Sequence, residues 1–129
     1  MGRVLVCLLF GLGTWTYVVQ ANTVSTKEVY ISISDVFIPD GPKSNGNSYV
    51  VVNGLFPNSC YRWSRAEVKD RSGTEHEIRL VATVSQTMCL MVLVPYSKEV
   101  VLGQLSRGEH TLRFVNGDGT FFERSLTVQ

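Results

Sequence analysis

Residues 111–128, TLRFVNGDGTFFERSLTV, carry the pattern that decides the fold. Leu112 and Phe114 alternate with polar neighbours, which is the two-residue period of a β-strand with one buried face. The turn residues Asn-Gly-Asp-Gly at 116–119 separate this strand from a second one over 121–128. Because both glycines can adopt positive φ at little cost, we expect a tight β-hairpin here.

The same period continues through most of the preceding chain. Strand-like alternation or β-branched runs occupy 29–34, 49–52, 60–69 and 78–84, and a short strand is expected over 100–102. The continuously apolar residues 89–94 predict a strand covered on both faces, and Pro95 is expected to end that strand or mark a bend. With turn signals about every 8–12 residues and no credible helix, the pattern predicts an all-β fold, an antiparallel two-sheet sandwich of about seven to eight strands. A small closed barrel is the alternative.

The N-terminal 21 residues are typical of an export signal. Arg3 supplies a positive start, residues 4–19 are mostly apolar, and Val19-Gln20-Ala21 fits the small-x-small cleavage pattern. We therefore predict a signal peptide over 1–21 and one domain over 22–129, located in the periplasm, at the cell surface or outside the cell. An uncleaved signal retained as a membrane anchor is the alternative. No later segment is apolar for long enough to cross a bilayer as a helix.

The charges of the chain are nearly balanced. The chain has twelve Lys and Arg residues and eleven Asp and Glu residues. Removal of Arg3 with the signal would make the numbers of basic and acidic residues equal. A neutral domain has no general basic field, which argues against nucleic acid as a partner.

Signal removal would leave two cysteines, Cys60 and Cys89. In an oxidising compartment they are expected to form a disulfide, which would close a loop of about 30 residues and stabilise the fold by roughly 3–4 kcal/mol. The alternative is a pair of buried free thiols. A catalytic pair is disfavoured because the spacing is not that of a CxxC motif.

Residues 105–114, LSRGEHTLRF, together with the following hairpin and Ser125-Leu126-Thr127-Val128, resemble the end of an immunoglobulin-like domain. In such domains a tyrosine caps a corner by hydrogen bonding to nearby backbone. His110 stands at the position of that tyrosine. The resemblance implies that His110 is a structural corner residue.

The wider pattern resembles small exported bacterial proteins with a single immunoglobulin-like β-sandwich domain. Their loose signature Gly-x-x-Pro-Asn-x-Cys-Tyr is matched by Gly54 to Tyr61, and their second cysteine by Cys89. Antibody-type domains differ, because Trp63 follows Cys60 by only three residues and Cys89 precedes the His110 corner. The resemblance implies a fold and an exported location and no particular activity.

Metal and catalytic signatures are weak in this sequence. His76 and His110 share no short ligand motif, and the two cysteines are expected to be paired, so we predict no metal site and no cofactor. His76 lies between two glutamates near a turn and is expected to be solvated. No nucleophile motif such as Gly-x-Ser-x-Gly is present, so the protein is not expected to be an enzyme.

Two regions, or else an unpaired sheet edge, are predicted to contact a partner. The first is the polar loop 39–47, whose carboxylates are too few for a calcium site, and its candidate contact residues are Asp40, Lys43, Asn45 and Asn47. The second combines residue types that are enriched at the centres of interfaces, and its members are Tyr61, Arg62, Trp63 and Arg65. On a regular strand, Tyr61, Trp63 and Arg65 would share one face. The alternative reading buries Tyr61 and Trp63 in the core.

These observations favour a non-catalytic, exported, immunoglobulin-like binding domain that contacts an envelope protein or polymer. The alternative is an inhibitor or immunity-type protein that blocks an exported hydrolase, since a rigid β domain loses little entropy on docking. A small hydrolase or carbohydrate-processing enzyme is a third hypothesis, supported only by dispersed carboxylates, namely Glu67, Asp70, Glu75 and Glu77. No stable membrane span is expected after signal removal.

Overall fold

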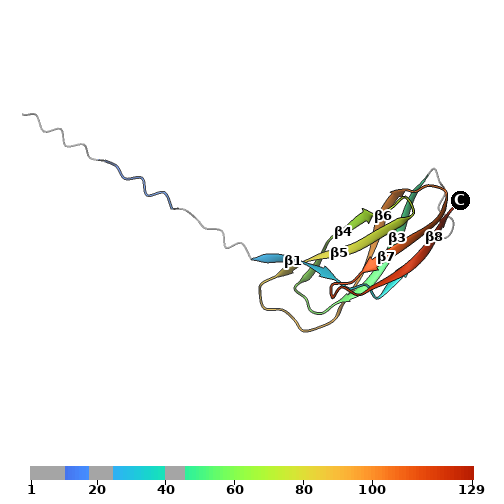
Figure 1. Cartoon of the computed structure of the whole chain (residues 1–129). Helices are drawn as coiled ribbons and strands as arrows, with labels where there is room; N and C mark the ends of the chain where they lie inside the picture. The colour runs from blue at the N-terminus through green and yellow to red at the C-terminus, as the bar shows by residue number, and fades with distance from the viewer. Residues whose placement is uncertain (1–10, 18–24, 40–45) are drawn as a thin grey trace, which may run out of the picture.

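The chain forms a two-sheet β-sandwich in a computed structural model that describes residues 11–17, 25–39 and 46–129 (Figure 1). Every regular element in these residues is a strand. The strands are β1 (Thr26–Ile31), β2 (Asp35–Phe37), β3 (Asn47–Phe56), β4 (Tyr61–Asp70), β5 (Glu75–Ser85), β6 (Val94–Gln104), β7 (Gly108–Val115) and β8 (Phe121–Val128). The predicted all-β, two-sheet sandwich is confirmed.

β5 is the centre of the larger, five-stranded sheet. One edge of β5 pairs with β4, and the other edge is shared between β1, which covers residues 80–85, and β7, which covers residues 75–79. β8 then pairs with β7. The prediction of antiparallel pairing holds for every pair but one, because β5 and β7 run parallel. In the smaller sheet, β3 lies between β2 and β6.

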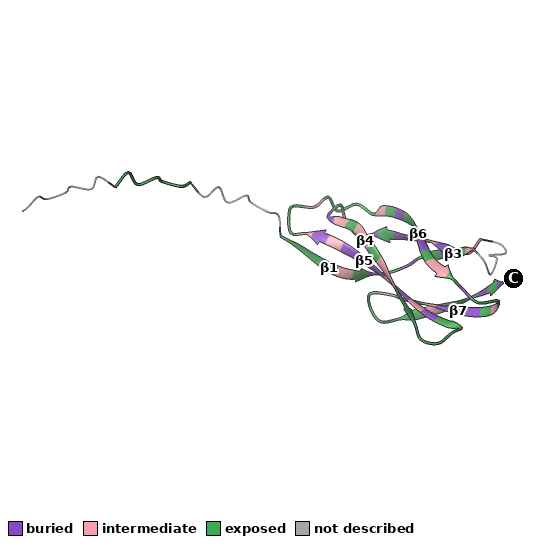
Figure 2. Ribbon diagram, turned by 90° about the horizontal axis from the view of Figure 1, so that it is seen from above, coloured by how far each residue is buried: buried purple, intermediate pink, exposed green. Residues whose placement is uncertain are grey.

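The core lies between the two sheets and is built by strand alternation. Ile78, Leu80 and Ala82 of β5 are fully buried, and Val50 and Val52 of β3 oppose them from the other sheet. Buried and exposed residues alternate along the strands in Figure 2. Each buried Val, Leu or Ile side chain contributes roughly 1.5–3 kcal/mol relative to exposure.

The hairpin between β7 and β8 is present at the predicted place. Gly119 adopts φ of +90°, whereas Gly117 does not have positive φ. Gly117 is instead required by close approach, because a Cβ at this position would overlap the backbone oxygen of Tyr30. Asn116 Oδ1 accepts a hydrogen bond from the N–H of Ile33 at 3.0 Å, so the turn is attached to the end of β1.

Residues 11–17 form no helix or strand, and their large side chains Leu12, Trp15 and Tyr17 are exposed. The rest of the predicted signal peptide lies outside the described residues. Among the residues described, no helix has the length and apolarity needed to cross a membrane.

Candidate functional site

A β-bulge in β4 rearranges the predicted contact residues Tyr61 to Arg65. Trp63 lies opposite Ala82 and Arg65 lies opposite Val81, so Ser64 is an extra residue on β4. A bulge turns the following side chains to the other face of the sheet. The prediction that Tyr61, Trp63 and Arg65 share one face is therefore wrong.

Tyr61 and Trp63 lie on the inner face and are half-buried against the core. The ring of Tyr61 stacks on Phe56 with centroids 5.9 Å apart, and the ring of Trp63 tilts against Tyr96 at 6.2 Å. Both aromatic side chains thus contribute to packing while keeping part of their surface accessible. This arrangement falls between the two alternatives that the sequence left open.

The side of the sandwich between β4 and β6 is open. β4 pairs only with β5 and β6 pairs only with β3 among the described strands, so each has an edge that no other described strand covers. A groove of about 500 Å³ lies between them, here called the β4–β6 groove. Its lining residues are Phe56, Arg62, Trp63, Pro95, Tyr96, Ser97 and Lys98.

Lys98 shows how open this side is. Lys98 lies two residues from Tyr96 and two from Val100 on β6, so all three share the inward face of the strand. Tyr96 and Val100 are buried, at 7% and 2% exposure. Lys98 is nevertheless exposed. Neither Lys98 nor Arg62 forms an ion pair with any residue that the structure describes. The groove therefore combines aromatic surface with two cations that are available to a partner.

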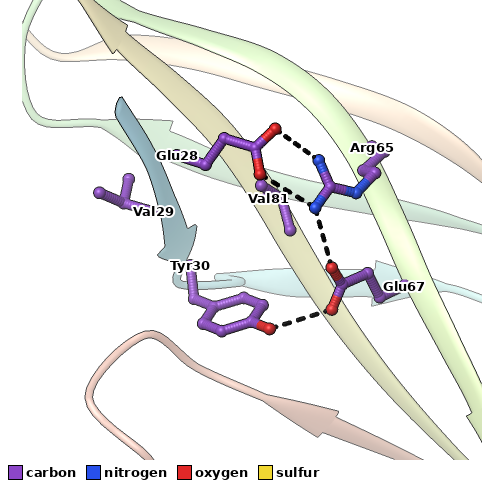
Figure 3. A pocket seen from close by; sticks show the side chains of 6 residues that line it. All are labelled: Glu28, Val29, Tyr30, Arg65, Glu67 and Val81. Carbon is purple, nitrogen blue, oxygen red and sulfur yellow. Dashed lines mark hydrogen bonds and ion pairs between the residues drawn. The ribbon is translucent and has the colours of Figure 1, made fainter. Parts of the chain in front are cut away.

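Arg65 lies on the outer face of the larger sheet, where it is already paired (Figure 3). Its guanidinium donates to both carboxylate oxygens of Glu28, at 2.7 and 3.0 Å, and to Glu67 at 3.0 Å. The hydroxyl of Tyr30 donates to the second oxygen of Glu67, also at 3.0 Å. These four residues are here called the Arg65 cluster.

The Arg65 cluster covers Val81, an outward-facing residue of β5 that is only 2% exposed. The hydrogen bond from Arg65 holds the pKa of Glu28 below its ordinary value, and the hydrogen bond to Glu67 raises the pKa of Tyr30. Because the ion-pair side chains are about half exposed, solvent screens them and their contribution to stability is small. Arg65 has its partners within the protein, so it is a poorer candidate for external contact than Arg62.

His76 and His110 form a buried hydrogen-bonded pair. They are 4% and 1% exposed, so the prediction that His76 is solvated is wrong. His76 continues the inward row of Ile78 and Leu80 on β5, and this alternation was the signal for its burial. The parallel pairing of β5 with β7 then brings His76 to His110, with Nε2 of His76 2.9 Å from Nδ1 of His110.

The histidine pair is bonded at both of its ends. Nδ1 of His76 lies 2.6 Å from Oδ1 of Asp70, and Nε2 of His110 lies 2.7 Å from the backbone oxygen of Ser106. The second bond is the contact to nearby backbone that the sequence predicted for His110. Since a carboxylate and a carbonyl both accept, Nδ1 of His76 and Nε2 of His110 are the donors of the two outer bonds.

The histidine pair offers no free base to a nucleophile. The hydroxyl of Ser106 lies 3.5 Å from Nε2 of His110, whereas the carbonyl that occupies this nitrogen is closer. Among the described residues, no group of three or more His, Cys, Asp or Glu is placed to hold a metal ion. The hydrogen bonds between Asp70 and His76 and between His76 and His110 link the end of β4 to β5 and β7.

The predicted disulfide between Cys60 and Cys89 is present, with the two Cα atoms 5.4 Å apart. The prediction of a doubly covered strand over 89–94 is wrong, because residues 88–93 lie outside both sheets and β6 begins at Val94. β6 also runs through Pro95, which is tolerated because an edge strand need not donate on its open side. Residues 88–93, here called the apolar loop, are held to the segment before β4 by the disulfide.

The other predicted contact region is not adjacent to this one. Asn47 is exposed at the start of β3, whereas the β4–β6 groove reaches Phe56 at the far end of the same strand. Ten residues of strand span about 30 Å. Asp40, Lys43 and Asn45 lie outside the described residues.

The fold and its cross-link define the chain as a single β-sandwich domain stapled by one disulfide. Residues 50–128 match the family described as the ORF11 beta-sandwich domain, and this stretch is more than half of the chain. The protein belongs to that family. Comparison with curated proteins and with solved structures finds no match.

Proposed function

We propose that this protein is a non-catalytic, exported, immunoglobulin-like binding domain that contacts an envelope protein or polymer through the β4–β6 groove. The observation that carries the proposal is Lys98, a cation at an inward position that the open side of the sandwich leaves exposed. A closed sandwich would place an apolar residue there, because a buried unpaired cation is costly.

The chemistry of the groove supports an acidic, extended partner. Arg62 and Lys98 supply positive charge, and the exposed parts of Trp63 and Pro95 supply apolar surface. The uncovered edges of β4 and β6 can accept backbone hydrogen bonds from an added strand. A polymer with carboxylate or phosphate groups would use the same two cations without the strand pairing.

Capture from envelope extract by the immobilised protein tests this proposal. The variant Arg62→Glu/Lys98→Glu is expected to lose capture of the specific partner, and Trp63→Ala is expected to weaken it. Lys69→Glu is the matched control, because Lys69 is an exposed cation at the other end of β4 and does not line the groove. Equal capture by the charge-reversed protein and by the control would reject the groove.

A second assay distinguishes envelope binding from the alternative function, inhibition of an exported hydrolase. Proteases and lysozyme-like enzymes are titrated with the protein while their activity is followed. Inhibition at micromolar concentration that disappears in Arg62→Glu/Lys98→Glu would assign the groove to enzyme inhibition. Unchanged activity across the panel, together with specific capture, supports the envelope-binding proposal.

A further inference from the structure

The apolar loop exposes a run of large hydrophobic side chains. The exposed fractions are 99% for Met88, 71% for Leu90, 82% for Met91, 53% for Val92 and 66% for Leu93. No residue from Thr87 to Val94 carries a charge. Single exposed apolar residues are ordinary, but a contiguous exposed group of this kind marks a site of contact.

The apolar loop is held in an exposed position by specific bonds. Cys89 is tied to Cys60, the N–H of Leu90 donates to the hydroxyl of Ser59 at 2.8 Å, and the N–H of Ser59 donates to the carbonyl of Leu90 at 3.0 Å. These three links fix the middle of the loop to the neighbouring turn. The apolar side chains are therefore presented in advance of binding, which lowers the entropy lost on contact.

The apolar loop lies at the end of the sandwich where the chain enters the fold. The N–H of Gln86 donates to the carbonyl of Ser25 at 2.8 Å, and Figure 1 shows the loop, in tan, beside the start of β1. The apolar run 4–19 ends six residues before Ser25. Where the run is retained as a membrane anchor, which is the alternative to cleavage, six residues reach at most about 20 Å and the bilayer lies within reach of the loop.

Basic residues occupy the first rows of the sheet next to the apolar loop. Lys27 pairs with Val84 and Arg62 pairs with Thr83, and both side chains are exposed. Glu28, in the same row as Arg62, is neutralised by Arg65. The apolar loop is thus followed by cations in the adjoining rows of the sheet. This order matches an anionic lipid surface, in which acyl chains lie beneath negative headgroups.

We propose that residues 88–93 insert into the interfacial layer of an anionic lipid bilayer, with Lys27 and Arg62 contacting the headgroups. The insertion orients the domain with its chain entry toward the membrane and its C-terminus away from it (Figure 1). The apolar loop itself does not line the β4–β6 groove, although Arg62 contributes to both sites, and the lipid contact is tested with lipid alone.

Vesicle flotation tests the proposal with protein that begins at Asn22, which contains every strand and core residue. The vesicles contain phosphatidylcholine with or without phosphatidylglycerol. Burial of a Leu or Met side chain strengthens partitioning about tenfold, so Leu90→Ser/Met91→Ser is expected to weaken it at least tenfold. Phe37→Ser/Val101→Ser is the matched control, because these residues are similarly exposed but lie on the smaller sheet.

A second readout places a reporter in the loop itself. Met91→Trp is expected to show a blue-shifted emission and quenching by brominated lipid, and thermal unfolding checks that each variant is folded. Three results would overturn the proposal: no flotation of the wild-type protein, equal weakening in the control, or a self-association that the loop variant abolishes. The last result would assign the loop to contact between two copies of the chain.

Discussion

The substitution Gly54→Ala tests the packing of the open side of the sandwich most directly. Gly54 of β3 lies opposite Tyr96 of β6, and the aromatic ring crosses over the glycine. A Cβ at Gly54 would overlap the Oη, Cζ and Cε1 atoms of Tyr96. The ring has little freedom to move, because it stacks on Phe56 with centroids 4.6 Å apart and its hydroxyl donates to the carbonyl of Ser32 at 2.5 Å.

The expected cost of Gly54→Ala follows from these contacts. An alanine in a strand would ordinarily gain about 0.5–1 kcal/mol over glycine. Displacing the ring of Tyr96 loses its hydrogen bond, about 1 kcal/mol, and adds overpacking of about 1–3 kcal/mol. We expect a net destabilisation of about 2 kcal/mol, which for a domain of this size lowers the melting temperature by about 10 °C.

Urea unfolding followed by circular dichroism measures this cost. Gly73→Ala is the control, because a Cβ there meets no atom within 4 Å. In a Tyr96→Ala background the ring is absent, so adding Gly54→Ala should cost nothing or stabilise. A stability of Gly54→Ala within about 0.5 kcal/mol of wild type, or an equal cost in both backgrounds, would refute the reasoning.

Three further predictions concern the disulfide, the histidine pair and alkaline pH. Reduction of Cys60–Cys89 should lower the free energy of unfolding by about 3–4 kcal/mol, measured in urea with and without reductant. Asp70→Asn removes the charge from the bond to His76 and should lower the free energy of unfolding by about 1–2 kcal/mol in the same assay. An unchanged free energy of unfolding would contradict this bond. Burial raises the pKa of Tyr96 to about 12, from 10.0 for an ordinary tyrosine. The folded state thus keeps a proton that the unfolded state releases, so stability should fall by about 1–3 kcal/mol as pH rises from about 10 to about 12, and Tyr96→Phe should flatten that fall.

The sequence predicted the fold class because the two-residue period is a local property. The hairpin at 116–119 and the alternation of Ile78 and Leu80 both depend on neighbours in the chain. The parallel pairing of β5 with β7 is not local, since nothing in either strand specifies its partner. The burial of His76 depends on that pairing together with the inward row, so it was missed.

Two site features were missed for different physical reasons. The bulge at Ser64 inserts one residue without any glycine or proline to mark it, and it moves Arg65 from the groove to the outer face. The apolar loop has the composition of a buried strand, and hydrophobicity alone cannot distinguish a core from a contact surface. The disulfide from Cys89 fixes this segment beside Cys60, just before β4 begins.

The division of one β5 edge between β1 and β7 has a kinetic consequence. Ile31 must find Leu80, and Glu75 must find Thr111, before the larger sheet is complete. Pairings so distant in sequence place folding in the range of milliseconds to seconds rather than microseconds. The larger sheet can therefore be completed only after β7 and β8 have been synthesised, although β5 and β1 are available earlier.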